Sequence, residues 1–351
     1  MRDCLAESYP ALATRLAKLS LAELPTPVSN HHVSLPSGSH DVAVKHDEAT
    51  STLYGGNKVR KLEYLLQRAV DQGAQRVATF GAVGSNHALA TAMHAHELGL
   101  PCTCFLSHQS VTPNVARTLN MHQRLGTEII RWGGGADKLA LFREHLQGRS
   151  AWVIPLGGTC WRGARGFVNA GRELAAQIGA GALAQPARIE ISCGTTGSAA
   201  GLALGIAAAG LDTVVHAVQV ADNPFASEQK MHRLIAKTHV ILQRLDPTFV
   251  ADDWQHRIVW RDEFLAGGYA RVDDATRGAV AAANRQLGLR LETTYTGKAM
   301  AALLHDLQAA DTAGRRFLFW NTYNARPLPV SADRPQTLAG IPDEFERYYA
   351  A

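Results

Sequence analysis

The chain has 351 residues, of which 46% are hydrophobic and 19% are charged. This length allows about two domains with buried cores, and the composition is typical of a folded soluble protein, not of a disordered or fibrous one. The 35 Lys and Arg against 31 Asp and Glu give a formal net charge of +4. Because these cations form no basic stripe, we expect no nucleic-acid partner.

Cysteine usage and hydropathy predict a cytoplasmic protein. The five cysteines are odd in number and show no C-x-x-C spacing, so they predict reduced thiols instead of a zinc ribbon or redox pair. Residues 1–16 carry Asp3 and Glu7 and lack an apolar run of signal-peptide length. The most apolar stretch, 199–211, is shorter than the roughly 20 residues of a membrane span. We therefore expect neither export nor a membrane segment.

Helical and strand patterns alternate regularly from residue 58 onward. The predicted helices are 58–71, 86–98, 114–125, 136–146, 163–177 and 198–209, and the predicted strands are 76–80, 102–106, 128–132, 152–155, 188–192 and 213–220. Strands separated by helices of this length form parallel sheets that are covered on both faces. The predicted fold class is therefore α/β.

Two turns at the carboxyl ends of predicted strands are the first candidates for a binding site, because ligands bind at that edge of such sheets. The segments are GAVGSNH at 81–87 and CGTTGS at 193–198, and each leads into a predicted helix. Free N–H groups and the positive end of the helix dipole would suit a phosphate or carboxylate there. Neither segment has the spacing of an ATP-binding or dinucleotide-binding loop. Alternatively, both are ordinary turns that need small residues for steric reasons.

A lysine segment decides between these interpretations. By itself, Lys58 in GGNKVRK at 55–61 reads as a solvated cation at a helix start. Residues 54–66, however, closely resemble the pyridoxal-phosphate lysine segment of the 1-aminocyclopropane-1-carboxylate deaminase and D-cysteine desulfhydrase family, fold-type-II enzymes similar to the tryptophan synthase β-subunit. Six further ordered matches support the resemblance: LPTPV at 24–28, GSNH at 84–87, IPLGG at 154–158, the loop at 194–202, GGY at 267–269 and YTGKA at 295–299.

The resemblance implies two three-layer domains, each with an open twisted parallel sheet, and pyridoxal 5'-phosphate between them. The smaller domain would span 61–167, and the larger would combine 1–60 with 168–351. Lys58 would form the Schiff base with the cofactor, with its pKa lowered by partial burial and by Lys61, which would lie near the phosphate. Asn86 would bond the 3′ oxygen, and Thr322 the pyridine nitrogen. The phosphate cup would consist of Gly194, Thr195, Thr196, Gly197 and Ser198.

Further matched residues would contact the substrate. The resemblance implies that Ser85 and His87 face it, with Ser85 near its carboxylate or carrying a proton, and that Trp161 shapes access. Tyr269 and Tyr295 match two tyrosines of the family's active site. Without the motif context, core packing would be the simpler interpretation of both tyrosines.

Two threonines favour a desulfhydrase-like reaction over cyclopropane opening. The deaminase subgroup carries Glu and Leu where this chain has Thr296 and Thr322. Because a neutral hydroxyl cannot hold a proton on the pyridine nitrogen, β-elimination or replacement is favoured. The expected reaction begins with transfer of the cofactor from Lys58 to the amine of a small amino acid. Lys58, Ser85 or Tyr295 then takes the Cα proton, a group such as thiolate departs, and hydrolysis gives a 2-oxo acid and ammonia.

Departures from the family keep other functions open. Desulfhydrases usually read HTGG around the threonine, whereas this chain reads NTYN at 321–324, and CWR at 160–162 also differs. The alternatives are therefore 1-aminocyclopropane-1-carboxylate deaminase, a cofactor-binding protein with altered or lost catalysis, or a synthase or racemase. Family members commonly form homodimers.

Histidine spacing does not indicate a metal site. His31 and His32 are adjacent, and His94 and His96 lie two apart on a predicted helix. Neither pair has the i, i+4 spacing that places two ligands on one helix face. We expect no metal.

Overall fold

A computed structural model describes residues 3–112, 114–133, 138–309 and 314–349. The chain divides into two compact units. The first unit combines Met1–Tyr64 with Thr159–Ala325, and the second combines Leu65–Gly158 with Arg326–Ala351. The predicted domains, 61–167 and its two flanks, differ from these units chiefly in the C-terminal segment, and as domain boundaries they stay a prediction.

The first unit is built on a six-stranded sheet with the strand order β1-β2-β10-β7-β8-β9. The strands are β1 (Val28–Leu35), β2 (Gly38–His46), β7 (Arg188–Cys193), β8 (Val214–Gln219), β9 (Ile258–Arg261) and β10 (Phe317–Asn321). Neighbouring strands run parallel except for the β1–β2 hairpin, which is antiparallel. All five residues of β10 are buried, as expected for a continuous apolar strand inside a sheet that is covered on both faces.

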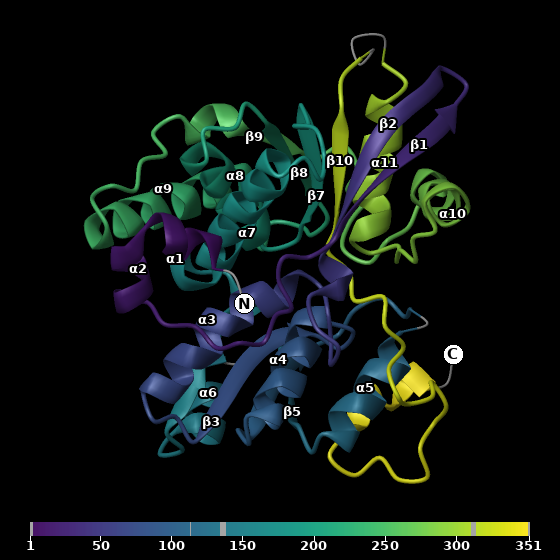
Figure 1. The fold of residues 1–351 in the computed structure, drawn as a ribbon. Helices are drawn as coiled ribbons and strands as arrows, with labels where there is room; N and C mark the ends of the chain where they lie inside the picture. Colours follow the sequence, from purple (N-terminus) through teal and green to yellow (C-terminus); the bar gives the residue numbers. More distant parts are fainter. Residues whose placement is uncertain (1–2, 113, 134–137, 310–313, 350–351) are drawn as a thin grey trace. The chain divides into compact units, whose positions relative to one another are not determined.

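Helices cover both faces of this sheet (Figure 1). On one face lie α7 (Trp161–Gly179), α8 (Gly197–Ala208) and α9 (Glu228–Leu245), and on the other lie α10 (Asp274–Leu287) and α11 (Thr296–Asp306). Each layer buries its own apolar cluster against the sheet. The short helices α1 (Cys4–Ser8) and α2 (Pro10–Arg15) pack against α7 and α9. Close packing of α7 on α8 requires glycine at 205, where a Cβ would lie 2.4 Å from the Val168 carbonyl oxygen.

The second unit has a four-stranded parallel sheet in the order β5-β4-β3-β6. Its elements are β3 (Arg76–Ala82), α4 (Asn86–Glu97), β4 (Cys102–Ser107), α5 (Val115–Arg124), β5 (Glu128–Arg131), α6 (Lys138–Leu146) and β6 (Ala151–Val153). The C-terminal segment ends in the 3-10 helix η5 (Asp343–Tyr349) and packs on α5. Helix α3 (Asn57–Asp71) begins in the first unit and ends in the second.

The predicted fold class is confirmed, and each predicted helix and strand from 58 to 220 has a counterpart within about two residues at the ends that the structure describes. The start of the predicted helix 136–146 lies outside the described residues. The antiparallel hairpin β1–β2 departs from the expected all-parallel sheet. Its two strands are joined by only two residues, which suits an antiparallel hairpin and not a parallel crossover. No helix among the described residues is long and apolar enough to cross a bilayer.

Candidate active site

Lys58 lies in the first turn of α3, directly after a loop that is tied to the end of β10. The Asn57 amide donates to the Thr322 carbonyl oxygen at 3.1 Å, and the Lys58 Nζ donates to Asn57 Oδ1 at 3.0 Å. Gly56 has φ +95°, and a Cβ there would lie 2.8 Å from the same Thr322 oxygen. The glycine therefore permits the close approach that brings Lys58 to the carboxyl edge of the sheet.

Burial makes the two lysines of this turn unusually easy to deprotonate. Desolvation lowers the pKa of Lys58 to about 8, against the opposing influence of the Cys193 thiol. The pKa of Lys61 lies well below its usual value, because burial and then the positive charge of Lys58 disfavour its ammonium form. Burial is thus the main cause of the Lys58 shift, and the repulsion between the amines acts on Lys61. A neutral amine at Lys58 is the nucleophilic form.

The turn before α8 is a candidate anion-binding site. Thr196, the residue before α8, has the left-handed φ of +70°. Its side chain makes no capping hydrogen bond to the first turn of that helix. A Cβ on Gly197 would lie 3.0 Å from Lys61 Nζ and 3.1 Å from Thr159 Oγ1. Asn57 Nδ2 donates to Ser198 Oγ at 3.0 Å. The helix N-terminus and a buried amine therefore converge on one place, where an anion would stabilise both.

Tyr269 and Tyr295 meet beside this turn. Their hydroxyl oxygens are 2.5 Å apart, and a Cβ on Gly194 would lie 3.3 Å from Tyr295 Cε1. Burial raises the pKa of Tyr269 to about 12, while burial and then Tyr269 raise the pKa of Tyr295 well above its usual value. Both phenols therefore hold their protons more firmly than an ordinary tyrosine does, so at neutral pH each can serve as a hydrogen-bond donor.

Two side chains, Glu292 and Lys298, position the tyrosines. The Glu292 carboxylate accepts hydrogen bonds from the backbone amides of Tyr295 at 2.9 Å and Thr296 at 2.8 Å, and so caps the start of α11. The buried Lys298 amine donates to the carbonyl oxygens of Leu265 at 2.7 Å and Gly268 at 2.9 Å, immediately before Tyr269.

Thr322 follows β10, and its hydroxyl lies 2.8 Å from the Ser192 hydroxyl at the end of β7. One of the unusual residues around it has a local structural role. Asn324 Oδ1 accepts a hydrogen bond from the Gly55 amide at 3.1 Å and so secures the lysine loop. The buried Nδ2 of Asn321 has no hydrogen-bond partner among the described residues. Asn324 thus takes part in holding Lys58 in place.

Ser85, Asn86 and His87 lie at the start of α4 in the second unit. Ser85 caps this helix by accepting a hydrogen bond from the Ala88 amide at 3.2 Å, and His87 Nε2 lies 3.0 Å from Thr79 Oγ1. A Cβ on Gly81 would lie 2.6 Å from Ser85 Cβ, so the turn requires glycine there. The contacts of Ser85, Asn86 and His87 with cofactor and substrate stay predictions.

Trp161 is the first residue of α7, and the Arg162 guanidinium lies 4.4 Å from the centre of its ring. Thr159, two residues earlier, donates to Thr195 Oγ1 at 2.7 Å. The segment that leads into α7 is therefore bonded to the turn before α8, but a role of Trp161 in substrate access stays a prediction.

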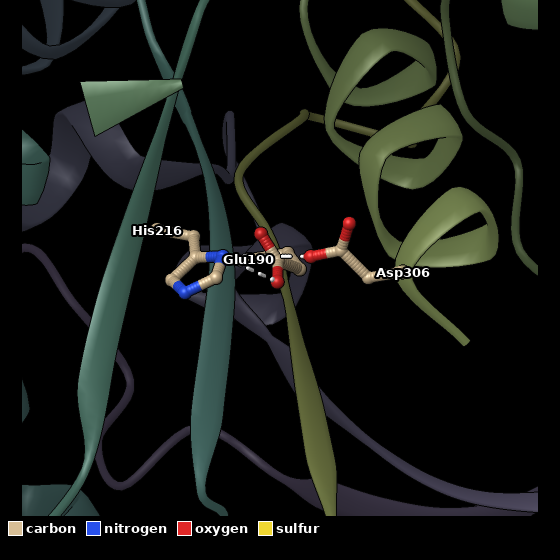
Figure 2. Close-up of side chains that lie close together, drawn as sticks. All are labelled: Glu190, His216 and Asp306. Atoms are coloured by element: carbon tan, nitrogen blue, oxygen red, sulfur yellow. Dashed lines mark ion pairs between the residues drawn. The ribbon is translucent and has the colours of Figure 1, made fainter. Parts of the chain in front are cut away.

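A buried group of possible metal ligands lies elsewhere in the first unit (Figure 2). Glu190 on β7, His216 on β8 and Asp306 on α11 come together, with His216 Nδ1 3.1 Å from Glu190 Oε1. The Arg261 guanidinium already binds Asp306 Oδ2 at 2.7 Å and lies 2.9 Å from His216 Nδ1. Because a cation already neutralises these ligands, we interpret the group as an ion-pair cluster.

Comparisons with known proteins identify the family. The model of the pyridoxal-phosphate dependent enzymes matches residues 19–322. The chain belongs to this family. It is 32% identical over 300 residues to D-cysteine desulfhydrase from Salmonella choleraesuis (strain SC-B67), covering 83% of this chain and 88% of the relative. It also resembles the crystal structure of an ACC deaminase homologue, with 28% identity, a TM-score of 0.75 and coverage of 93% of this chain and 96% of that one. A pyridoxal 5'-phosphate-dependent aspartate racemase, with 14% identity, a TM-score of 0.58 and coverage of 92% and 95%, shares the fold.

The residues of this family member fit its cofactor. Two desolvated lysines, an uncapped turn whose glycine cradle a Cβ would fill, and a pair of hydroxyls lie within the first unit. These groups could hold an aldehyde, a phosphate and a ring nitrogen. The predicted family, the enzyme class and the cofactor are confirmed.

The structure brings Lys58, Lys61, the 194–198 turn, both tyrosines and Thr322 together, whereas four other contributors were not predicted. These are Asn57, Thr159, Glu292 and Asn324. Asn57 stands next to Lys58 in the quoted motif, which was a usable signal. Thr159 and Asn324 act across 36 and 269 positions of sequence, whereas Glu292 bonds residues only three and four positions further on. The residue types of these three alone gave no signal.

Proposed function

We propose that this pyridoxal-phosphate dependent enzyme is a lyase that acts on a small β-substituted amino acid of the D-cysteine type. Water is consumed, the Cβ–S bond breaks, and the products are hydrogen sulfide, a 2-oxo acid and ammonia. The observation that carries the proposal is the hydroxyl pair of Thr322 and Ser192 in the Lys58 site. A neutral partner for the ring nitrogen favours β-elimination over transamination. The D-cysteine desulfhydrase relatives agree with this substrate class.

The chain's own residues supply the proton transfers and the binding contacts. Pyridoxal phosphate supplies an electron sink that weakens the Cα–H bond of a bound amino acid. Burial gives Lys58 a pKa of about 8, and its neutral amine can accept the Cα proton of a bound amino acid at Nζ. Tyr295 stays protonated and can donate a hydrogen bond to the departing group. Lys61 and the 194–198 turn bind the phosphate, and Ser85, Asn86 and His87 add the contacts predicted for the second unit.

A second candidate function follows from Asn321–Asn324. Extra side-chain volume beside Thr322 would suit a cofactor-binding protein with altered or lost catalysis. Cyclopropane opening, the activity of the deaminase subgroup, is disfavoured by Thr296, whose backbone and hydroxyl are engaged by Glu292. Both alternatives are decided by the same assay.

The assay measures 2-oxo acid and ammonia release from D-cysteine, L-cysteine, other β-substituted amino acids and 1-aminocyclopropane-1-carboxylate. We expect D-cysteine to be the preferred substrate of the yellow holoenzyme. Lys58→Ala should lower turnover by about 10²–10⁴-fold and remove the violet absorption of the bound cofactor. Lys237→Ala, on an exposed position of α9, is the matched control and should resemble the wild type.

Two outcomes would contradict the proposal. Full turnover and unchanged absorption in Lys58→Ala would exclude Lys58 as the cofactor lysine. A wild-type protein that binds the cofactor but processes none of these amino acids would instead support the binding protein.

We also infer that the enzyme works as a cytoplasmic homodimer. None of its five cysteines forms a disulfide, and four of them are buried, which suits a reducing compartment. Homodimers are common in the family that the sequence resembles. Light scattering of the purified protein measures the oligomeric state.

A further inference from the structure

The C-terminal segment of the chain is anchored along α5 by side-chain bonds to its backbone. We call residues 326–349 the C-terminal strap. Asn120 Nδ2 donates to the carbonyl oxygens of Ser331 at 3.0 Å and Asp333 at 2.9 Å, and Gln123 Nε2 donates to that of Thr337 at 2.8 Å. The strap lies beyond residues 19–322, which the family model matches. It therefore adds contacts that the matched region does not contain.

Near its end, the strap binds the segment that follows β4. The Gln109 amide donates to the Tyr348 hydroxyl at 3.0 Å, and that hydroxyl donates to the Gln109 carbonyl oxygen at 3.0 Å. His108 Nδ1 lies 3.1 Å from the same hydroxyl, and its ring packs edge-on against Phe345 at 5.2 Å. Tyr348 and Phe345 are both buried. The Tyr348 hydroxyl thus bonds both the amide and the carbonyl group of Gln109 and holds its backbone in place.

The side chain of Gln109 extends this contact to the turn before α4. Its Oε1 accepts a hydrogen bond from the Gly84 amide at 3.1 Å, and a Cβ on Gly84 would lie 2.9 Å from its Nε2. Gly84 immediately precedes Ser85 and Asn86, the residues predicted to contact substrate and cofactor. The bond from Gln109 therefore restrains the backbone that carries them.

We propose that Gln109 is a positioning residue for the turn Gly84–Asn86, and that Tyr348 of the C-terminal strap holds Gln109 in place. The effect on catalysis rests on the proposed function, because it requires Ser85 and Asn86 to bind substrate and cofactor. The effect of Gln109 on the conformation of the turn does not depend on the proposed function. The two claims are tested by separate measurements on the full-length holoenzyme.

Hydrogen–deuterium exchange tests the mechanical claim with Gln109→Met and Tyr348→Phe. Methionine keeps the length of the side chain but cannot accept the Gly84 bond, and phenylalanine keeps the packing against His108 but loses the hydroxyl. Loss of one hydrogen bond should make amides in peptides covering 82–88 exchange about fivefold faster. The control is Tyr349→Phe, because the Tyr349 hydroxyl binds Asn120 on α5 and not the 108–109 segment. It should leave these peptides unchanged.

Steady-state kinetics on D-cysteine test the catalytic claim. We expect KM to rise about fivefold in Gln109→Met and Tyr348→Phe, with kcat changed less than about twofold, because the lost restraint lowers the population of the binding-competent turn. Unchanged exchange in both variants would overturn the proposal, and a change in Gln109→Met alone would overturn the role of the strap. If the wild type fails to turn over D-cysteine, the proposed function fails, and the exchange measurement still decides the positioning claim.

Discussion

At the scale of single residues, the amine of Lys58 is tuned by its surroundings more than by its neighbours in sequence. Its pKa of about 8 follows from desolvation where the loop meets β10. The sequence identified this lysine only through a resemblance of the whole segment, because a lysine at a helix start is ordinarily solvated. The residues that secure it, Asn324 and Thr322, lie more than 250 positions away, and their contacts follow from the pairing of β10 with β2 and β7.

This tuning predicts the pH dependence of cofactor uptake by the apoenzyme. With a pKa of about 8, about a tenth of the Lys58 amines are neutral at pH 7 and about nine tenths at pH 9. The rate of cofactor binding should therefore rise about tenfold over this interval and then level off. Stopped-flow absorbance after mixing apoenzyme with pyridoxal phosphate measures it. A rate that continues to climb tenfold per pH unit to pH 10 would indicate an ordinary, solvated lysine.

At the scale of elements, the site depends on two segments. These are α3, which carries Lys58 and Lys61, and the turn before α8. Arg60, a buried residue of α3, binds Asp47 at 2.8 Å and Glu173 at 2.9 Å in a buried network. Burial acts to raise the pKa of Glu173, but Arg60 and then Lys45 outweigh it and hold that pKa at about 2. Helical periodicity predicted α3 itself, whereas a network with members on four elements is not visible in any local pattern.

The turn before α8 gives a sharp test of the phosphate seat. In Gly197→Ala the new methyl group would lie 3.0 Å from Lys61 Nζ and displace the flexible end of that side chain. We expect affinity for pyridoxal phosphate to fall about tenfold, the equivalent of about 1.4 kcal/mol, because the amine leaves the anion seat. Cofactor titration by absorbance measures the change.

The matched control is Gly278→Ala on α10, where a Cβ would meet no atom within 4 Å. It should stabilise the helix by about 0.5–1 kcal/mol and leave cofactor affinity unchanged. Equal affinity in Gly197→Ala and the wild type would show that the phosphate binds elsewhere.

At the scale of the whole molecule, the sequence predicted the α/β class because alternating periodicity reports directly on buried faces. It did not predict the β1–β2 hairpin or the long-range ties of the strap. These depend on which segments meet, and hydrophobic pattern alone does not specify partners. The Glu190 cluster is a further example, since its members come from β7, β8, β9 and α11.

That cluster makes stability depend on pH. Burial raises the pKa of Glu190, and bonds to Asp306 and Glu190 raise the pKa of His216 against its own desolvation. Because both values rise on folding, the folded protein holds these protons to higher pH than the unfolded chain does. Stability should therefore fall as the pH increases through the raised pKa values. Glu190→Gln removes the carboxyl part of this dependence.

Relative to the wild type, Glu190→Gln should gain about 2–4 °C in the Tm of the first unit between pH 5 and pH 8, or about 1 kcal/mol for a unit of this size. Differential scanning calorimetry at the two pH values measures the gain. Glu228→Gln, at an exposed position in the first turn of α9, is the control and should follow the wild type within about 1 °C. A Glu190→Gln variant that loses stability relative to the wild type as the pH rises would mean that the ionised carboxylate stabilises the sheet. The buried charge would then be fully compensated by Arg261 and His216, and the cluster would be a stable ion-pair network instead of a source of pH sensitivity.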